Sequence, residues 1–470
     1  MTRSLHARTA AAACVIAAVA VAVAAVSPAF HALPFMAPDS ASYLQADVGR
    51  TAGYPLLLRA VPLNWLEGLQ VAALALTAAW LAVEAAPIIH PLLAIGLEAS
   101  ILGNPALMSY AFTVLPEAFF VSAVQAHLAL ALRLLRRPTR PAASALGVLA
   151  AVLVLLKPSG YSFLLAAPAL LWLTRRHARV VVPPFVAALA TVLVAAGAVN
   201  FARSGVFATQ AYGGYAAIGY VAHLLDGRTP TAYPGLTATI VDRTETTRRE
   251  LGRIKDTDLY YMASSSAYHD VLDAVRPAIL DYVRRNDPGV NARTAFVRMN
   301  AIAQSLTVST VAHHPAGYVT HAATHVYGLW LMPLIRNRAD RNAFSARLAT
   351  LAEAAPYTMR HPLTYRELPA LAYWPIKIAL VLALVLSLAG LASMFGRHQR
   401  ADGGALAYTA VALHANFLLV SAVQTGLPRY ALAMWPATMM VLVLGVSWCG
   451  KVAGVTGEER GAMRHDVRSD

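Results

Sequence analysis

Long apolar runs alternate with short basic stretches along most of this chain, and that alternation is its strongest structural signal. A helix that crosses a bilayer needs about 20 predominantly apolar residues, and runs approaching that length recur from one end of the chain to the other. We therefore expect an all-α polytopic membrane protein. The pattern predicts about ten spans, at 10–30, 63–83, 87–103, 113–135, 142–157, 161–174, 180–201, 371–395, 405–424 and 430–449.

A long polar segment interrupts this pattern after the seventh run. Its charged helical patterns, such as 244–256 and 268–288, predict a helical domain outside the membrane. Residues 306–334 are apolar but contain four histidines and Pro315, which favours a segment at the membrane interface. The expected organisation is an N-terminal transmembrane module with a first outer loop, an outer-face helical insert, a C-terminal transmembrane module and a cytoplasmic tail, at 1–202 (loop 31–62), 203–369, 370–450 and 451–470.

Composition supports a membrane protein and changes how the positive net charge is interpreted. The 470 residues are 58% hydrophobic and 13% charged, and the mean hydropathy is +0.53, far above that of soluble proteins. The formal net charge of +14 comes largely from basic loops between apolar runs, so membrane orientation explains it and nucleic acid is not an expected partner. The two cysteines, Cys14 and Cys449, lie in distant apolar runs and predict neither a disulfide nor a metal site.

The basic loops also predict a topology. With ten spans and the N-terminus inside, the short clusters at 133–140, 175–179 and 397–400 and the C-terminal tail all fall on the cytoplasmic side. Both termini are then cytoplasmic, and the 31–62 loop and the insert face outward. The first run is expected to be an uncleaved anchor, because cleavage after the small residues at 27–29 would leave Asp39 close to a free terminus.

Charged residues gather at the outer ends of the predicted spans. The first outer loop carries Asp39, Asp47 and Arg50, and Glu117 opens the fourth span on the same side. Arg50 and Arg59, with Lys157 and Arg429, are cations on the side that the positive-inside rule leaves poor in them. Lys157 and Arg429 either snorkel to lipid headgroups or belong to an anion site near the outer leaflet. Asp39 either belongs to such a site or caps a short helix running through Tyr43 and Ala46.

Other polar residues are expected to be structural. Glu67, Glu98, His127 and His414 lie in apolar runs, where polar groups usually pair within the bundle. His321 and His325 share a helix face, but no acid completes a zinc-protease pattern, so we expect interfacial or structural histidines. Ser40 and Ser42 have no neighbouring base and do not predict a nucleophile.

Several motifs, in order along the chain, resemble those of the membrane-embedded GT-C glycosyltransferases, in particular the bacterial relatives of the protein O-mannosyltransferases. They cover the N-terminal half and the last span, and the insert between 203 and 300 matches none of them. The motifs are Pro38-Asp39-Ser40 with Tyr43-Leu44, Arg50 and Gly53-Tyr54-Pro55-Leu56, then Leu115-Pro116-Glu117, Leu156-Lys157-Pro158, His314-Pro315-Ala316-Gly317-Tyr318 and Pro428-Arg429-Tyr430.

This resemblance implies an inverting transfer of a sugar from a polyprenyl-phosphate carrier to an acceptor on the outer face of the bacterial inner membrane. It implies that Asp39 is the general base, and that Asp47 and Glu117 orient the acceptor or the base. The lipid phosphate would bind Arg50, Lys157 and Arg429, and Tyr43, Tyr54 and Tyr430 are further candidates.

Two departures from the family limit what it implies. Ser40 follows Asp39 where a second acid is frequent, which argues against a divalent metal, and no cofactor is assigned. Lys157 stands where arginine is frequent and keeps the charge without the planar fork. The sugar and the acceptor, whether glycan, glycolipid or protein, stay open. So do three other functions: a transporter or flippase of lipid-linked sugar, a polysaccharide polymerase or ligase, and a non-catalytic membrane assembly subunit.

Overall fold

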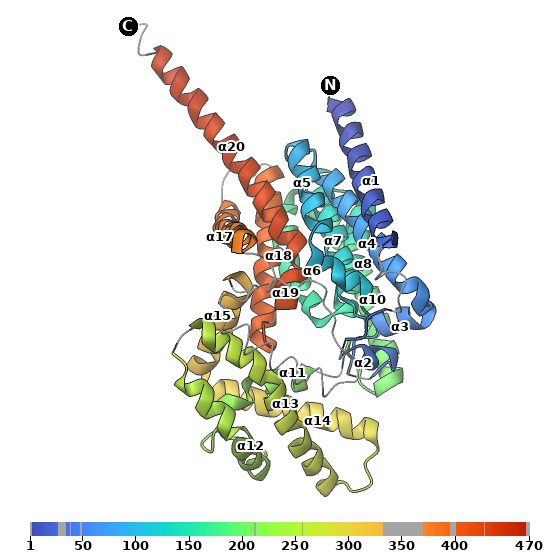
Figure 1. The fold of residues 1–470 in the computed structure, drawn as a ribbon, viewed down its shortest axis with the longest axis vertical. Helices are drawn as coiled ribbons and strands as arrows, with labels where there is room; N and C mark the ends of the chain where they lie inside the picture. Colours follow the sequence, from blue (N-terminus) through green and yellow to red (C-terminus); the bar gives the residue numbers. More distant parts are fainter. Residues whose placement is uncertain are drawn as a thin grey trace.

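The chain folds into an apolar helical bundle with a separate helical lobe at one end (Figure 1). The computed structural model describes residues 2–26, 34–37, 39–47, 49–210, 213–255, 257–331, 370–394, 401–426 and 428–466. Within these residues the structure is helical, and the only extended pairing is an isolated bridge between Phe35 and Thr113. The segment at 27–29, the basic residues at 397–400 and the end of the predicted insert, 332–369, lie outside the described residues.

Each apolar run that predicts a span contains a helix. These ten are α1 (Thr2–Val26), α4 (Leu63–Ala85), α5 (Pro91–Leu102), α7 (Glu117–Arg136), α8 (Arg140–Leu156), α9 (Tyr161–Leu173), α10 (Ala178–Ser204), α17 (Ala370–Ser393), α18 (Ala401–Val423) and α20 (Trp435–Asp466). Short helices connect them, namely α2 (Ser40–Leu44), α3 (Gly53–Ala60), α6 (Pro105–Met108), α19 (Pro428–Ala433) and the 3₁₀ turns η1 (Ser109–Phe112), η2 (Pro158–Gly160) and η3 (Arg175–His177).

By length and composition, five helices in the described part of the chain can cross a bilayer, as expected of a helical membrane protein. They occupy Ala7–Val26, Leu63–Ala85, Glu117–Arg136, Arg175–Ser204 and Asp402–Val423. Four further apolar helices are shorter, at 10–17 residues: Pro91–Leu102, Arg140–Leu156, Pro158–Leu173 and Lys377–Ser393.

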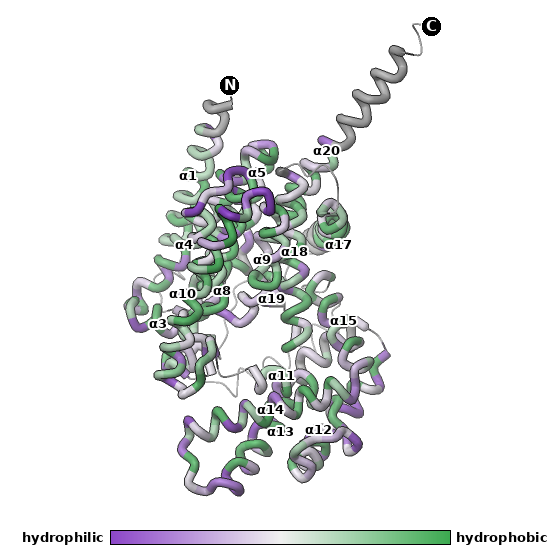
Figure 2. Tube along the Cα trace, turned by 180° about the vertical axis from the view of Figure 1, so that it is seen from behind, coloured by the Kyte–Doolittle hydropathy of each residue, from purple (hydrophilic) through white to green (hydrophobic). Residues whose placement is uncertain are grey.

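The bundle is organised around α7. In its most apolar window 83% of residues are buried, against 22% for the windows of α1 and the α10 region, so α7 is central and the other two are peripheral. The outer faces of the peripheral helices carry exposed Val15, Val19 and Val194, a surface suited to lipid contact. Hydropathy separates the two parts of the molecule, since the bundle is mainly apolar and the lobe is mixed (Figure 2).

The lobe is the helical insert predicted from the charged segment. It consists of α11 (Gly213–Val221), η4 (Ala222–Leu224), α12 (Pro234–Arg253), α13 (Thr257–Asn286), α14 (Ala292–His313) and α15 (Pro315–Leu331). Its own core includes Ile218, Ile240, Val275, Ile279 and Leu306, all nearly fully buried. α1 begins and α20 ends at one end of the bundle, and the lobe lies at the opposite end (Figure 1).

The segment predicted to lie at the membrane interface contains the end of α14 and the whole of α15. α14 ends and α15 begins at His314-Pro315, because proline cannot continue the helix. His321 and His325 do share a face, with ring centroids 4.7 Å apart, and both are buried. The hydroxyl of Tyr260 lies 3.0 Å from Nδ1 of His321, so this histidine has a structural partner.

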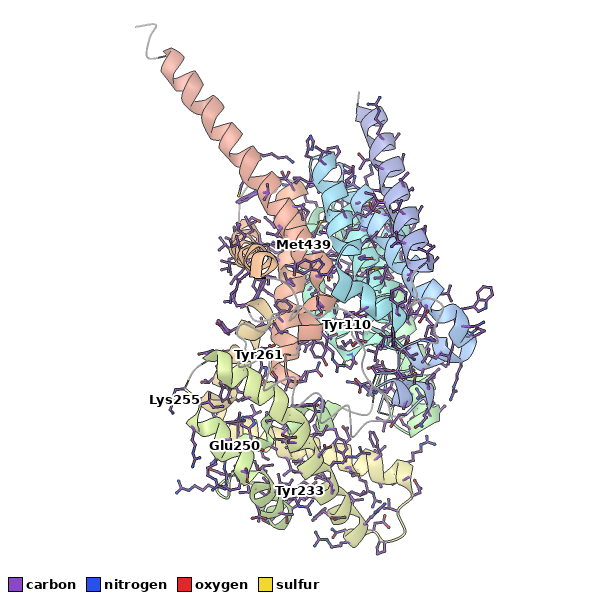
Figure 3. The ribbon with its side chains drawn as sticks, viewed as in Figure 1. Tyr110, Tyr233, Glu250, Lys255, Tyr261 and Met439 are labelled. Atoms are coloured by element: carbon purple, nitrogen blue, oxygen red, sulfur yellow. The ribbon has the colours of Figure 1, made fainter. Side chains whose placement is uncertain are left out.

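The lobe is fixed to the bundle at the end of α18. The hydroxyls of Tyr220 and Tyr318 donate to the carbonyls of Ser421 (2.6 Å) and Ala422 (2.7 Å). Tyr261, labelled at this junction in Figure 3, donates to the carbonyl of Gly426. The N–H of Gly426 in turn donates to Nδ1 of His325 at 3.1 Å. The stretch before α19 is therefore held by the lobe on one side and by the bundle on the other.

Candidate functional site

Asp39 stands at the start of α2, but its carboxylate does not cap that helix. α2 ends at Leu44, earlier than expected, and Ala46 takes a left-handed backbone conformation (φ 51°) that turns the chain out of the helix. The buried Ser40 hydroxyl accepts from the N–H of Ala37 (2.8 Å) and donates to the carbonyl of Val114 (2.7 Å). The Ser40 hydroxyl therefore holds the Asp39 loop against the segment preceding α7.

The Asp39 carboxylate lies between two arginines. Its Oδ1 is 2.6 Å from Nη2 of Arg50, and its Oδ2 is 3.1 Å from Nη1 of Arg429. Arg50 is held in turn by a bond from its Nε to Ser42 (2.8 Å) and by the face of the Tyr43 ring, 4.5 Å away. Burial raises the pKa of Asp39, but the two guanidinium charges lower it further, so its pKa lies well below the ordinary value.

A second ion pair joins Glu117 and Lys157. The Nζ of Lys157 lies 2.9 Å from Oε1 of Glu117, and their side chains are only 7% and 2% exposed. Glu117 is the first residue of α7, and Lys157 directly follows the last residue of α8. A carboxylate at a helix N-terminus and an ammonium at a C-terminus are each favoured by the helix dipole. Helix ends therefore fix this pair at the edge of the bundle.

α19 connects the two ion pairs. Arg429 contacts Asp39, while the ring of its neighbour Tyr430 lies 4.3 Å from Nζ of Lys157. The guanidinium of Arg429 is also 5.4 Å from that ring. Three cations and two carboxylates leave a net charge of +1, which suits an anion. We call this group the charged cluster; its members are Asp39, Arg50, Glu117, Lys157 and Arg429.

The Gly53-Tyr54-Pro55 motif brings α3 close to the cluster. A Cβ on Gly53 would lie 2.6 Å from the carbonyl oxygen of Leu155, so only glycine permits this approach to the end of α8. Thr51 Oγ1 also donates to the carbonyl of Leu156 at 3.3 Å. Tyr54 is fully buried and packs edge-on against Tyr43 at 5.3 Å. The motif therefore supports the cluster through packing.

The side chain of Asp47 does not join the other predicted site residues, although its carbonyl accepts from the N–H of Arg50. Its side chain is exposed, and its Oδ1 accepts from the N–H of Gly49 at 2.8 Å, which closes a turn within the loop. Arg203 donates to the carbonyl of Ala46 (2.7 Å) and ties this turn to the end of α10. The structure thus gathers eight of the nine predicted residues, namely Asp39, Tyr43, Arg50, Tyr54, Glu117, Lys157, Arg429 and Tyr430.

Two residues near the cluster were not predicted. Ser42 anchors Arg50, and His269 on α13 is close enough to Arg429 and Asp39 to sense both charges. Burial and then the positive charge of Arg429 lower the pKa of His269. Nothing in the amphipathic pattern of α13 distinguishes His269 from other polar positions; only its place in the fold does.

The polar residues in the apolar runs either have a hydrogen-bond partner or are buried without one among the described residues. His127 pairs with Tyr408 (2.5 Å) and His414 with Ser387 (2.8 Å), as expected for structural histidines. Gln70, on the same helix as Glu67, bonds to the carbonyls of Ala111 and Thr113. The expectation of a hydrogen-bonded partner is wrong for Glu98, which is fully buried with neither carboxylate oxygen bonded among the described residues. Oε1 of the buried Glu67 likewise has no partner among these residues.

Comparisons of this chain with protein-family models, with curated proteins and with solved structures found no match.

Proposed function

We propose that this protein is a GT-C-type glycosyltransferase with ten spans and both termini in the cytoplasm of a bacterium. It transfers a sugar from a polyprenyl-phosphate carrier to an acceptor at the outer face of the inner membrane, with inversion. One observation carries the proposal: residues as distant as Asp39, Lys157 and Arg429 meet in one charged cluster. The cluster involves the ends of α7 and α8 and adjoins the lobe, where a lipid phosphate would lie.

The cluster offers donors for the phosphate of the carrier. Arginine forks bind phosphate oxygens well, and Arg50 and Arg429 converge from two sides of Asp39. The Nε of Arg429 is buried and has no hydrogen-bond partner among the described residues. Because an unsatisfied buried N–H is costly, a phosphate oxygen that accepted from it would be stabilised. Lys157, oriented by Glu117, adds a third cation.

The same arginines control the proposed base. While both guanidiniums face Asp39, its carboxylate is ionised but a poor proton acceptor. A bound phosphate competes for the two guanidiniums and so raises the pKa of Asp39 towards its ordinary value. Donor binding then activates the base. Asp39 is 31% exposed and can meet an acceptor hydroxyl, whereas Glu117 is nearly enclosed and serves to position Lys157.

The reaction is a single displacement. An acceptor hydroxyl, its proton passing to Asp39, attacks the anomeric carbon on the face opposite the phosphate. The bond between that carbon and the phosphate oxygen breaks, and the negative charge on the departing polyprenyl phosphate is stabilised by Arg50, Lys157 and Arg429. One displacement inverts the anomeric configuration. A positioned base contributes about 10²- to 10⁴-fold to such a rate.

The test is release of polyprenyl phosphate by purified full-length protein in lipid nanodiscs. A panel of undecaprenyl-phosphate hexoses and pentoses is supplied with a bacterial envelope extract as acceptor source, and undecaprenyl phosphate is measured by mass spectrometry. We expect Asp39→Asn to reduce release at least about 100-fold. Asp281→Asn, an exposed change on α13, should leave it unaltered. Full activity of Asp39→Asn would overturn the base assignment.

The alternatives predict other outcomes. Transporter sites usually lie at the midplane of the bilayer, whereas Glu117 and Lys157 lie at helix ends. A flippase would move the lipid-linked sugar across a vesicle bilayer without releasing polyprenyl phosphate. A polymerase or ligase would act only on carriers that hold an oligosaccharide and would release nothing from the single-sugar carriers of the panel. An assembly subunit would neither release polyprenyl phosphate nor move lipid-linked sugar across the bilayer.

A further inference from the structure

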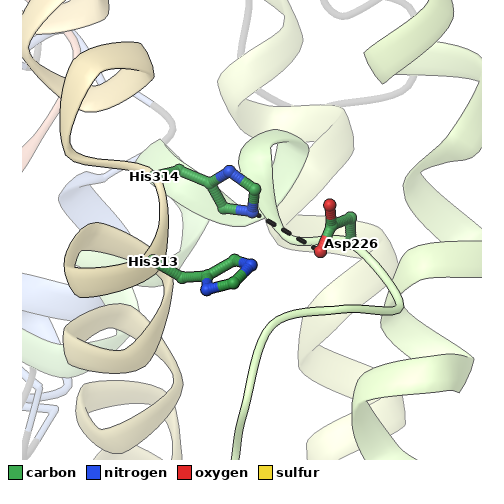
Figure 4. A group of neighbouring side chains, drawn as sticks. All are labelled: Asp226, His313 and His314. Atoms are coloured by element: carbon green, nitrogen blue, oxygen red, sulfur yellow. Dashed lines mark ion pairs between the residues drawn. The ribbon is translucent and has the colours of Figure 1, made fainter.

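Two adjacent histidines and an aspartate meet on the lobe, away from the charged cluster. Asp226, His313 and His314 each present one ligand atom, and these atoms lie within 4.8 Å of one another. Nε2 of His314 is 3.5 Å from Oδ1 of Asp226. Figure 4 shows both imidazoles beside the Asp226 loop, which approaches them from another part of the lobe.

The break between α14 and α15 allows neighbouring histidines to act together. Consecutive residues of a continuous helix point about 100° apart. Here His313 is the last residue of α14, and His314 leaves helical geometry (φ −119°, ψ 52°) before Pro315 begins α15. The two rings pack edge-on, 4.7 Å apart. The break thus places both imidazoles beside Asp226.

Further contacts orient the carboxylate. Oδ1 of Asp226 accepts from the N–H of Arg228 (3.0 Å) and from the hydroxyl of Thr229 (2.9 Å). The Thr229 oxygen is also 3.2 Å from Nε2 of His314, the nitrogen that would bind the metal, so this contact would be exchanged for the metal bond. The bonds to Asp226 would remain, and bonds that fix the orientation of a ligand are typical of metal sites, where their loss weakens affinity about 10- to 100-fold.

The chemistry of the three ligands favours a divalent transition metal. Zinc binds imidazole nitrogen and carboxylate oxygen at about 2.0–2.2 Å, so tetrahedral ligands are separated by about 3.3 Å. The His314–Asp226 separation is close to that value, and the exposed His313 ring can rotate to complete the set. Two histidines and one carboxylate with a fourth position for water are a known zinc arrangement. Soft or borderline metals suit imidazole better than Mg²⁺ does.

We propose that Asp226, His313 and His314 bind one Zn²⁺ ion, which joins the loop after η4 to the α14–α15 junction. This site is independent of the proposed transferase chemistry. Asp226 also lines a cavity of about 460 Å³ together with Arg248 and Tyr260. Neither histidine lines this cavity, so Asp226 is the residue that the cavity and the proposed metal site share.

The test is titration of the intact protein with Zn²⁺. Full-length protein purified with a histidine-free tag, stripped with chelator and held in nanodiscs, is titrated with ZnCl₂ by calorimetry. We expect one saturable equivalent, unaffected by excess Mg²⁺. The double variant His313→Ala/His314→Ala should lose it, and Asp226→Asn should weaken it at least about tenfold. Thermal unfolding of each variant without metal shows whether it still folds.

A matched control separates this site from general histidine binding. His90 and His177 are exposed and lie at the ends of bundle helices, so His90→Ala/His177→Ala should retain wild-type affinity. Equal affinity in the wild type and the His313/His314 variant would overturn the proposal, as would an equal loss in the control. Asp39→Asn should bind Zn²⁺ normally, so failure of the proposed transferase leaves this result unchanged.

Discussion

At the scale of single residues, the most consequential feature is that the Asp39 carboxylate forms ion pairs with two arginines. Its pKa is held below the ordinary value, so its ion pairs stabilise the fold wherever the carboxylate is ionised. Above the unfolded-state pKa of about 3.9 this contribution is fully present, and it declines as the pH falls towards the folded-state pKa. A low pKa of Asp39 therefore stabilises the fold, whereas the proposed role of this carboxylate as a general base requires a higher pKa.

A pH series tests that balance. We expect the gap in unfolding temperature between wild type and Asp39→Asn to be constant from about pH 7 to 5 and to narrow below about pH 4. Groups common to both proteins cancel in this difference. The measurement is thermal unfolding in nanodiscs at each pH. A gap that persisted unchanged at about pH 3 would show that the charge of Asp39 does not stabilise the fold.

The buried pair of Glu117 and Lys157 gives a second prediction at this scale. Lys157→Met leaves the Glu117 charge buried without its partner, and we expect a loss of about 3–5 kcal/mol in the free energy of unfolding. The double variant Lys157→Met/Glu117→Gln should recover much of it, because no unpaired charge remains. Denaturant unfolding of the four proteins of this cycle gives the coupling. A double variant as unstable as Lys157→Met would contradict the ion-pair account.

At the scale of elements, close packing of α3 on α8 sets the shape of the site. Gly53→Ala would place a Cβ 2.6 Å from the Leu155 carbonyl, and we expect about 1–3 kcal/mol of destabilisation together with reduced activity. Gly235→Ala, near the start of α12, meets nothing within 4 Å and should be neutral or stabilising by up to about 1 kcal/mol. Unfolding of both variants by denaturant provides the comparison. Equal stability would mean that α3 can shift without cost.

The contacts between the lobe and the bundle also position the site. Tyr220 and Tyr318 hold the end of α18, and Gly426 is held from both its N–H and its carbonyl, just before Arg429. We expect Tyr220→Phe/Tyr318→Phe to increase hydrogen exchange at 421–430, since each lost bond is worth about 1 kcal/mol. Tyr233→Phe, within the lobe, is the control. Unchanged exchange would show that the lobe does not order α19.

At the scale of the molecule, the sequence predicted local structure better than contacts between segments that are distant in sequence. The apolar runs predicted helices at all ten places, because span length and hydropathy are local properties. Asp39 and Arg429 are 390 positions apart, and no pattern between them predicts their contact. The positive-inside rule placed both at the outer face, and the family resemblance grouped them in one site. The burial of His321, and the lack of a partner for the Glu98 carboxylate within the described part of the chain, depend on which helices become neighbours, so hydropathy could not predict either.

Orientation in the membrane is the prediction on which the whole proposal depends. The start of α1 and the end of α20 lie opposite the lobe, so a cytoplasmic N-terminus would put the lobe and the charged cluster outside. With Cys14 and Cys449 replaced by serine, we expect Asp281→Cys on the lobe to react with an impermeant maleimide in intact cells. Arg137→Cys, between α7 and α8, should react only after permeabilisation, because basic loops stay inside. The reverse pattern would place the cluster in the cytoplasm, beyond reach of an outer-face acceptor, and would exclude the proposed reaction.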